Sequence, residues 1–190
     1  MSRTFVFRCG VCVALGAVGC VSDGKPDDDG EASASSAITI NTSASYSLVG
    51  VQSSKCVGVV GVSAAPGARL DIETCTGTAN QRFRPEAMGG GWFRMRNELN
   101  GLCIDVSGVS LADGAAVIQF GCSTGLNQQW AFTDVAGGSE VITARHSGKV
   151  LDVTGQVTTD GTLVEQWSSN GGANQHFVMS EALPAIIVRP

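Results

Sequence analysis

The feature that most constrains this chain is a repeat of 47 residues. One short pattern occurs three times at this interval: Asn-Gln, then any residue, then an aromatic residue. The Asn and aromatic residues of the three copies are Asn80 and Phe83, Asn127 and Trp130, and Asn174 and Phe177. The turn signals Pro66-Gly67, Asp113-Gly114 and Asp160-Gly161 recur at the same interval. Three units, 45–91, 92–138 and 139–185, therefore follow one another without a gap.

Each unit predicts short β-strands joined by turns. Apolar residues do not recur at helical spacing in any unit. The chain has 25 Gly and only 15% charged residues, which favours short strands with many turns over a helical bundle. A single unit of this kind cannot bury its apolar face alone. We therefore expect an all-β structure that three units close with pseudo-threefold symmetry.

Tandem units that end in this way resemble the ricin B-type (R-type) β-trefoil lectin family, which includes carbohydrate-binding modules of bacterial glycosidases. The stretches 148–153 (GKVLDV) and 171–175 (GGANQ) are close to the sequence patterns that are usual in that family. The resemblance covers about residues 45–182 and implies a β-trefoil. We accordingly expect a lectin domain over residues 45–185, followed by a short tail, 186–190.

The first 20 residues read as an export signal. Residues 1–8 carry two Arg and no acid, and residues 9–19 are uncharged and too few to span a membrane. The ending AVGC resembles the lipobox of bacterial lipoproteins, whose Cys becomes the lipidated first residue. We expect a signal peptide over 1–19 and a lipid on Cys20, with ordinary signal-peptidase cleavage as the alternative. The protein is then exported and anchored to the bacterial cell envelope, at the outer membrane or cell surface, and otherwise secreted.

Residues 20–44 read as a solvated tether and lead-in to the domain. The stretch 21–36 (VSDGKPDDDGEASASS) holds five acids and one Lys among small polar residues, a composition that cannot bury apolar surface. The whole chain has a net charge of −5, which excludes a general polyanion binder. We expect no nucleic-acid partner, and contact with a membrane only through the lipid anchor.

The seven cysteines divide by location. Cys9 and Cys12 leave with the signal peptide, and Cys20 takes the lipid. In an oxidising compartment the remaining four should pair, and three connectivities are open to them. The repeat selects the two pairs that lie within one unit at a separation of 19: Cys56–Cys75 and Cys103–Cys122. Each bridge should contribute about 3 kcal/mol on the chain-entropy account.

These cysteines also suggest a strand register. If the two cysteines of a repeat were cross-strand partners, the residues two positions inward would face each other on the same side of the sheet. The resulting pairs are Asp105–Phe120, Asp152–Trp167 and Gly58–Glu73. A carboxylate should therefore face an aromatic ring in the second and third repeats, but not in the first.

A carboxylate beside an aromatic ring suits a sugar. The ring covers the C–H face of a pyranose, the carboxylate accepts hydrogen bonds from hydroxyls, and Asn both donates and accepts. In the resembling family the strand Asp, the aromatic residue and the Asn before Gln-x-Trp are the sugar contacts. Carried over to this chain, the carbohydrate-binding residues are Asp152, Trp167, Asn174 and Gln175 in the third repeat, and Asp105, Phe120, Asn127 and Gln128 in the second. The first repeat keeps Asn80 and Gln81 without the Asp and the ring, so we expect it not to bind sugar.

Several of these residues also have a structural interpretation. The repeated Gln and the aromatic residue two positions later can serve the fold alone, with the rings in the core. The Asn, like Asp152, could hold a turn through its side chain. Trp167 should point outward because alternation sends Val164 inward. The same alternation points Gln119 and Gln166 inward, which suggests either a bulge in the strand or a role on the ligand side.

No pattern of a catalytic or metal site accompanies the repeats. His146 and His176 stand outside metal-ligand motifs, and there is no nucleophile elbow or phosphate-binding glycine loop. Glu73, Glu140 and Glu165 lack the partner that a glycosidase pair needs. We expect a protein that is not an enzyme and uses no cofactor or metal.

The expected function is a carbohydrate-binding module on the cell envelope, with one or two weak sites whose useful binding depends on avidity. Its glycan could be a galactose-type sugar or a polysaccharide such as xylan, and the residues do not choose between them. The alternative is a non-catalytic trefoil that binds a protein partner or supports an envelope assembly. Ile118 and Phe120 would offer such a partner an outward apolar pair.

Overall fold

A computed structural model describes residues 39–135 and 137–181. These residues form β-strands joined by turns, several of which are single 3-10 turns. Within them there is no helix long and apolar enough to cross a membrane. The predicted signal peptide 1–19, the lipidation site Cys20, most of the tether and the tail 186–190 lie outside the described residues.

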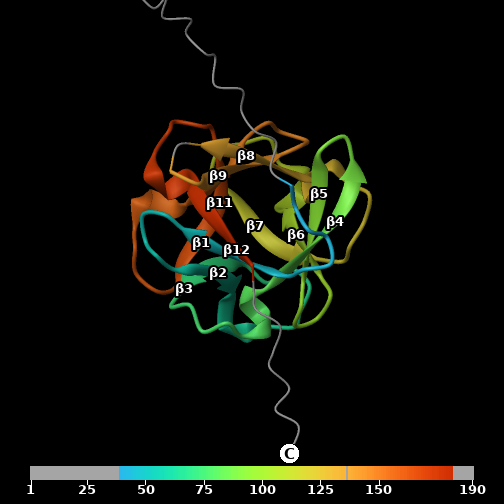
Figure 1. Ribbon diagram of the computed structural model, residues 1–190, viewed down its shortest axis with the longest axis horizontal. Coiled ribbons are helices and arrows are strands. Elements are labelled where there is room, and N and C mark those ends of the chain that lie inside the picture. Colours follow the sequence, from blue (N-terminus) through green and yellow to red (C-terminus); the bar gives the residue numbers. More distant parts are fainter. Residues whose placement is uncertain (1–38, 136, 182–190) are drawn as a thin grey trace, which may run out of the picture. The chain divides into compact units, whose positions relative to one another are not determined.

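Six of the described strands close a barrel (Figure 1). They are β1 (Tyr46–Gly50), β4 (Phe83–Gly89), β5 (Trp92–Asn97), β8 (Trp130–Val135), β9 (Ser139–Ala144) and β12 (His176–Glu181). Antiparallel pairing runs from β1 through β4, β5, β8, β9 and β12 and returns to β1. Closure leaves these strands no free edge along the ring.

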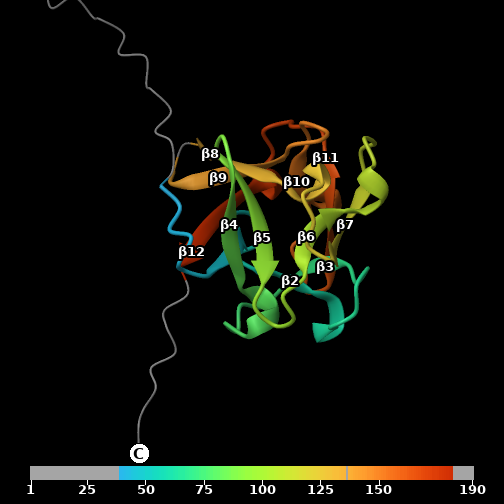
Figure 2. The ribbon, with the colours of Figure 1, turned by 90° about the vertical axis from the view of Figure 1, so that its right-hand side faces the viewer.

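Three hairpins cover one end of this barrel, on the right-hand side of Figure 2. They are β2 (Cys56–Val59) with β3 (Leu70–Glu73), β6 (Cys103–Val106) with β7 (Ala115–Phe120), and β10 (Val150–Val153) with β11 (Thr162–Trp167). Strand β11 also pairs with β3 and β7, so the hairpins contact one another. Each repeat thus supplies two barrel strands and two cap strands, which is the predicted β-trefoil.

Two 3-10 turns recur in each repeat. One follows the first cap strand: η1 (Val60–Val62), η3 (Ser107–Val109) and η5 (Thr154–Gln156). The other lies before the last strand and carries the repeated Asn and Gln: η2 (Ala79–Gln81), η4 (Leu126–Gln128) and η6 (Ala173–Gln175). The repeated motif therefore starts on a turn and ends in the barrel.

Equivalent residues of the three repeats fill the core. The buried sets include Leu48, Met95 and Ile142, then Leu70, Val117 and Val164, and the motif aromatics Phe83, Trp130 and Phe177. The core role of the aromatics is therefore confirmed. Because each set draws one residue from each repeat, no repeat completes the core alone.

Both predicted disulfides are present, but the strand register inferred from them is wrong. Cys56–Cys75 and Cys103–Cys122 join Cα atoms 5.0 and 5.1 Å apart. Cys75 and Cys122 lie beyond the ends of β3 and β7, so each bridge ties a strand to the loop after its neighbour. The strand partner of Cys103 is Phe120.

The true register is displaced by two residues from the expected one. Asp152 opposes Glu165, and Trp167 opposes Val150. The corresponding partners in the other repeats are Asp105–Ile118 and Gly58–Asp71. Because a displacement of two keeps every side chain on its side of the sheet, Asp152 and Trp167 still share one face. The predicted site residues can therefore meet, although they are not direct partners.

The inward glutamines are contacts between repeats. Gln119 Nε2 donates to the backbone oxygens of Ser63 and Ala65, at 2.8 and 2.9 Å. Gln166 Nε2 donates in the same way to Ser110 and Ala112, at 2.7 and 2.9 Å. Each side chain is buried and binds the turn of the preceding repeat, which accounts for a polar residue at an inward position.

Candidate functional site

The third repeat carries a pocket of about 240 Å³ that is lined by predicted site residues. Strands β10 and β11 form its floor, and η5 and the loop before η6 form its sides. The residues that line it are Asp152, Gly155, Gln156, Glu165, Trp167, Asn170 and Asn174. Three of the four predicted residues of this repeat therefore meet in one pocket. The fourth, Gln175, is buried and hydrogen-bonded to Asp152.

The carboxylate of Asp152 organises this pocket. Its Oδ2 accepts hydrogen bonds from Asn174 Nδ2 at 2.9 Å and from Gln175 Nε2 at 2.8 Å. Asn174 Nδ2 also reaches the backbone oxygen of Val153 at 3.2 Å, and Asn170 N donates to Gln175 Oε1 at 2.9 Å. The repeated Asn and Gln thus hold the Asp and the adjacent loop. The other carboxylate oxygen of Asp152 has no partner among the described residues, which leaves it available as an acceptor.

Two carboxyl groups face each other across the pocket floor. Burial raises the pKa of Asp152, although the hydrogen bonds from Gln175 and Asn174 work against that rise. Burial also raises the pKa of its cross-strand partner Glu165. The pocket therefore carries an acidic floor whose charge responds to mildly acidic pH more than that of exposed acids.

The second repeat supports the ring of Trp167, which is 40% exposed. The backbone of Gly114 comes so close that a Cβ at this position would lie 3.6 Å from Trp167 Cζ3. The turn itself is tied down, because Asp113 Oδ1 accepts from Lys149 Nζ at 2.6 Å and from Ser168 N at 2.8 Å. The site of the third repeat is thus completed by its neighbour.

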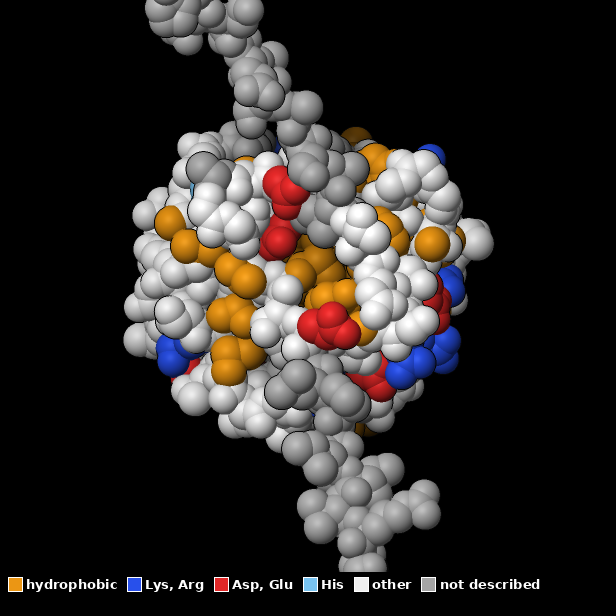
Figure 3. Space-filling model, viewed as in Figure 1, with side chains coloured by type: hydrophobic (Ala, Val, Ile, Leu, Met, Phe, Trp, Pro, Cys, Tyr) orange, Lys and Arg blue, Asp and Glu red, His pale blue; other side chains and the backbone are white. Residues whose placement is uncertain are grey.

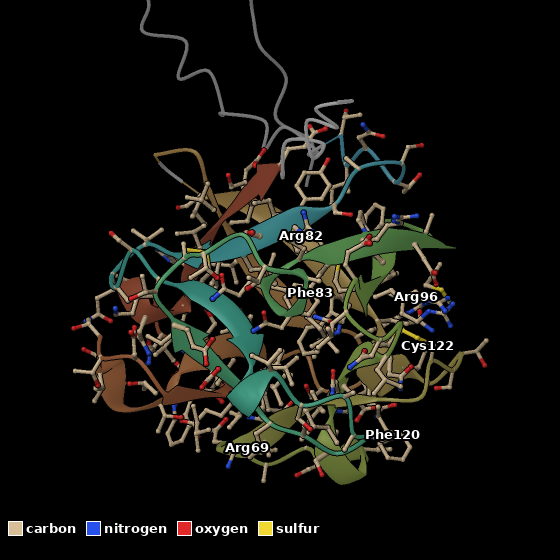
Figure 4. All side chains as sticks on the ribbon, turned by 90° about the horizontal axis from the view of Figure 1, so that it is seen from below. Arg69, Arg82, Phe83, Arg96, Phe120 and Cys122 are labelled. Carbon is tan, nitrogen blue, oxygen red and sulfur yellow. A yellow bond between two sulfur atoms is a disulfide. The ribbon has the colours of Figure 1, made fainter. Side chains whose placement is uncertain are left out.

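The second repeat contains the same hydrogen-bond network around Asp105. Its Oδ2 accepts from Asn127 Nδ2 at 3.0 Å and from Gln128 Nε2 at 2.7 Å. Phe120 lies at the rim of the molecule in Figure 4 and is 50% exposed, whereas the ring of Phe83 is fully buried. Ile118, not an acid, opposes Asp105, so the surroundings of this carboxylate are more apolar.

The first repeat has a pocket at the equivalent place, with a volume of about 400 Å³. Its lining residues are Val62, Glu73, Thr74, Thr76, Thr78, Asn80, Gln81, Asp160 and Gly161. Gly58 stands where the other repeats have Asp, and Glu73 stands where they have a ring. The side chain of Glu73 folds toward the glycine, with Oε2 3.4 Å from the position that a Gly58 Cβ would take.

Asp71 lies opposite Gly58 and is only 3% exposed. Its Oδ1 is buried and has no hydrogen-bond partner among the described residues. Burial, followed by the negative charge of Glu73, raises the pKa of Asp71 to about 6. The first repeat thus keeps a carboxyl group on this face, but on the other strand of the hairpin.

Many of the basic side chains are paired with acids, whereas Arg69, Arg82 and Arg145 form no ion pair with a described residue. In Figure 3 the largest group of Lys and Arg side chains lies at the right-hand edge of the face in view, beside β4 and β5. Arg84 contacts Glu98 at 2.9 Å, and Arg94 and Arg96 both contact Glu86. Glu86 thus binds two arginines of the neighbouring strand, and Arg84 forms a separate pair with Glu98. In the part of the chain that the structure describes, no group of three His, Cys, Asp or Glu is placed to hold a metal ion.

Several lining residues of the third-repeat pocket were not predicted, namely Gly155, Gln156, Glu165 and Asn170. Gln156 follows Gly155 in the left-handed region with a φ of 58°, as Val62 and Val109 do at the equivalent positions, with φ of 52° and 53°. Such a backbone is unfavourable for non-glycine residues, above all for Val, and is typical of sites that bind ligands. The signal available in the sequence was the change from Val to Gln at one position of an otherwise regular repeat.

Comparison with known proteins agrees with this geometry. A sequence profile described as the ricin-type β-trefoil lectin domain matches residues 44–177. Comparison with curated protein sequences found no match. Among solved structures, the chain is 38% identical to the designed threefold-symmetric protein ThreeFoil, with a TM-score of 0.70 over 72% of this chain and 97% of that one.

Two natural proteins extend the comparison. The chain is 35% identical to part of an exo-β-1,3-galactanase from Clostridium thermocellum, with a TM-score of 0.72 over 75% of this chain and only 31% of that one. A ricin B-like lectin from Macrolepiota procera, solved in complex with lactose, is 17% identical, with a TM-score of 0.66 over 75% of this chain and 99% of that one. At that identity the lectin shows a shared fold alone.

Proposed function

Since this chain belongs to the ricin-type β-trefoil lectin family, we propose that it is a non-catalytic glycan-binding module whose main site is the pocket of the third repeat. The family and the lectin neighbours support carbohydrate binding in general. The observation that carries the proposal is one pocket that joins the Asp152 carboxylate, the amide of Asn174 and the ring of Trp167.

The chemistry of the pocket matches that of a pyranose. The free oxygen of Asp152 accepts a hydrogen bond from a sugar hydroxyl, and a charged acceptor makes this bond stronger than a neutral one. Asn174 lines the pocket beside this carboxylate, and its Nδ2 holds Asp152 Oδ2 at 2.9 Å, which fixes the direction of the free oxygen. The exposed ring of Trp167 then covers the C–H face of the sugar.

Galactose-containing glycans are the first ligands to test. The Macrolepiota procera lectin was solved with lactose, and an earthworm R-type lectin with the same fold was solved with GalNAc. The Clostridium thermocellum relative is named for a β-1,3-galactan substrate. Galactose-type sugars therefore have more support than xylan.

We also propose display on the cell envelope through a lipid on Cys20. The support is the AVGC stretch at the end of an apolar segment, followed by an acidic tether. Display of many copies on one surface would convert weak single sites into useful avidity. A Cys20→Ser variant should move from the membrane fraction to the soluble exported fraction. Retention of this variant in the membrane fraction would contradict the anchor.

A protein partner is the second candidate function, and the second repeat favours it. Large apolar side chains are exposed there: Val109, Leu111, Phe120 and Leu126. Exposed apolar side chains of this size suit a protein contact. A partner bound through this surface should be lost with Phe120→Ala and should not be displaced by free sugars.

The glycan proposal is tested by an array followed by titration calorimetry. Trp167→Ala should weaken binding to the third repeat by roughly 2- to 13-fold, because the lost stacking is worth about 0.5–1.5 kcal/mol. Phe120→Ala is the matched variant for the second repeat. Both rings are exposed, so neither change should lower thermal stability much. If the wild type binds no glycan, or if binding survives both substitutions together, the proposal fails.

A further inference from the structure

The pocket of the first repeat keeps the scaffold of a binding site and changes its chemistry. Gln81 holds the loop as its counterparts do, with Nε2 donating to Thr74 O at 3.0 Å and Thr76 N donating to Oε1 at 2.8 Å. The neighbouring turn is tied in the same manner as in the third repeat. Asp160 Oδ1 contacts Lys55 Nζ at 2.5 Å, and Thr74 Oγ1 donates to Asp160 Oδ2 at 2.9 Å. The loop and the neighbouring turn are therefore held here as they are in the third repeat.

One buried amide in this pocket has lost its acceptor. In the other repeats the Asn Nδ2 donates to the strand Asp, but Gly58 provides no carboxylate for Asn80. Asn80 lines the pocket and is only 1% exposed, and its Nδ2 makes no hydrogen bond with any described residue. This Nδ2 lies 3.4 Å from the position that a Gly58 Cβ would take, as Glu73 Oε2 does, so a ligand that enters the space left by the glycine can accept a hydrogen bond from it.

The charge of the pocket is negative and only partly balanced. Lys55 is engaged with Asp160, and no Lys, Arg or His of the described residues lies within 4.0 Å of Glu73. Asp71, next to Glu73 on the same face of β3, adds a second acid behind the lining. A carboxylate with no cation beside a row of hydroxyls is suited to an ammonium group, which has three donors and one positive charge.

No aromatic residue lines this pocket, so the C–H face of a neutral pyranose could not stack on a ring here. Glu73 occupies that position, and its carboxylate reaches toward the space that Gly58 opens. Favourable binding must then come from charge and hydrogen bonds, not from stacking.

We propose that the first repeat binds an unacetylated amino sugar, with its ammonium group on Glu73 and its hydroxyls on Asn80 and the threonine side chains. This inference rests on the proposed function only in taking the ligand to be a sugar. It assigns to the first repeat a ligand class different from the neutral glycans proposed for the other two. It also revises the expectation that this repeat binds nothing, because that expectation considered only the Asp and ring arrangement.

The test compares two trisaccharides of equal length, one of glucosamine and one of N-acetylglucosamine. Both are titrated into protein that carries Trp167→Ala and Phe120→Ala, which weakens sugar binding by the other two repeats. The glucosamine trisaccharide should bind at least tenfold more tightly than the acetylated one, because acetylation removes the charge. This binding should weaken as salt is added.

Glu73→Gln in the same background should lower the affinity for the glucosamine trisaccharide at least tenfold. Glu181→Gln, which changes an exposed acid at the end of β12, is the matched control and should have no effect. Equal binding of the two trisaccharides, or unchanged affinity in Glu73→Gln, would overturn the inference. Neutral-glycan binding by protein with intact Trp167 and Phe120 is a separate readout, so this inference and the proposed function can fail independently.

Discussion

Asp71→Asn is expected to stabilise the protein at neutral pH and to change its stability little in acid. The pKa of Asp71 is raised from 3.8 to about 6 in the folded protein, mainly by burial. A raised pKa means that the folded state favours the protonated acid. The contribution of this group to stability is therefore complete below pH 3.8 and is lost as the pH rises through 6. A shift of about two units corresponds to roughly 3 kcal/mol.

Urea unfolding of the wild type and Asp71→Asn across this pH range measures the effect. The difference between the two proteins should grow to about 2–3 kcal/mol in favour of the variant above pH 7 and nearly vanish near pH 4. Glu181→Gln serves as the control because its acid is exposed. If the free energies of unfolding of Asp71→Asn and wild type differed by the same amount at every pH, the prediction would be wrong, because the ionisation of Asp71 would then not affect stability. A native acid that weakens the fold at neutral pH is typical of a functional site.

Asp152→Asn should remove most of the glycan affinity of the third repeat while leaving the fold intact. An Asn side chain can present its oxygen to Asn174 and Gln175, as Oδ2 does in the wild type. Its amide nitrogen then takes the place of the free carboxylate oxygen, so that an acceptor becomes a donor. Hydrogen bonds to a charged group contribute about 1.5–3 kcal/mol, which corresponds to a loss of roughly 10- to 150-fold.

Titration of the array-selected glycan into this variant, together with a thermal melt, checks the prediction. Asp105→Asn is the matched change in the second repeat, where the same network surrounds the carboxylate. It should leave the third-repeat affinity unchanged. An Asp152→Asn protein that melts like the wild type and binds as tightly would mean that Asp152 serves only to hold the loop.

The inward glutamines mark one limit of what a repeat can predict. Alternation correctly placed Gln119 and Gln166 on the core side, but their acceptors lie on a turn of the preceding repeat. The sequence of one repeat does not predict which segment of another repeat will lie beside it. The support of Trp167 by Gly114 was missed for the same reason.

The strand register marks a second limit. The disulfide pairs followed from the repeat, yet the cysteines do not stand opposite each other on paired strands. A bridge constrains only the distance between two residues, and a strand and the loop after its neighbour satisfy that distance equally well. The predicted face survived the error because a shift of two positions preserves alternation.

The sequence by itself determined the three repeats, the trefoil, the core aromatics and the disulfides, because these depend on periodicity along the chain. It also selected Asp152, Trp167 and Asn174, which share one pocket. Only the tertiary structure decided which residues oppose one another, how each repeat completes the next, and where Glu73 places its charge in the first repeat. Those features depend on packing between segments that are distant in the chain. A repeated sequence pattern does not predict how residues that differ between the repeats pack against one another.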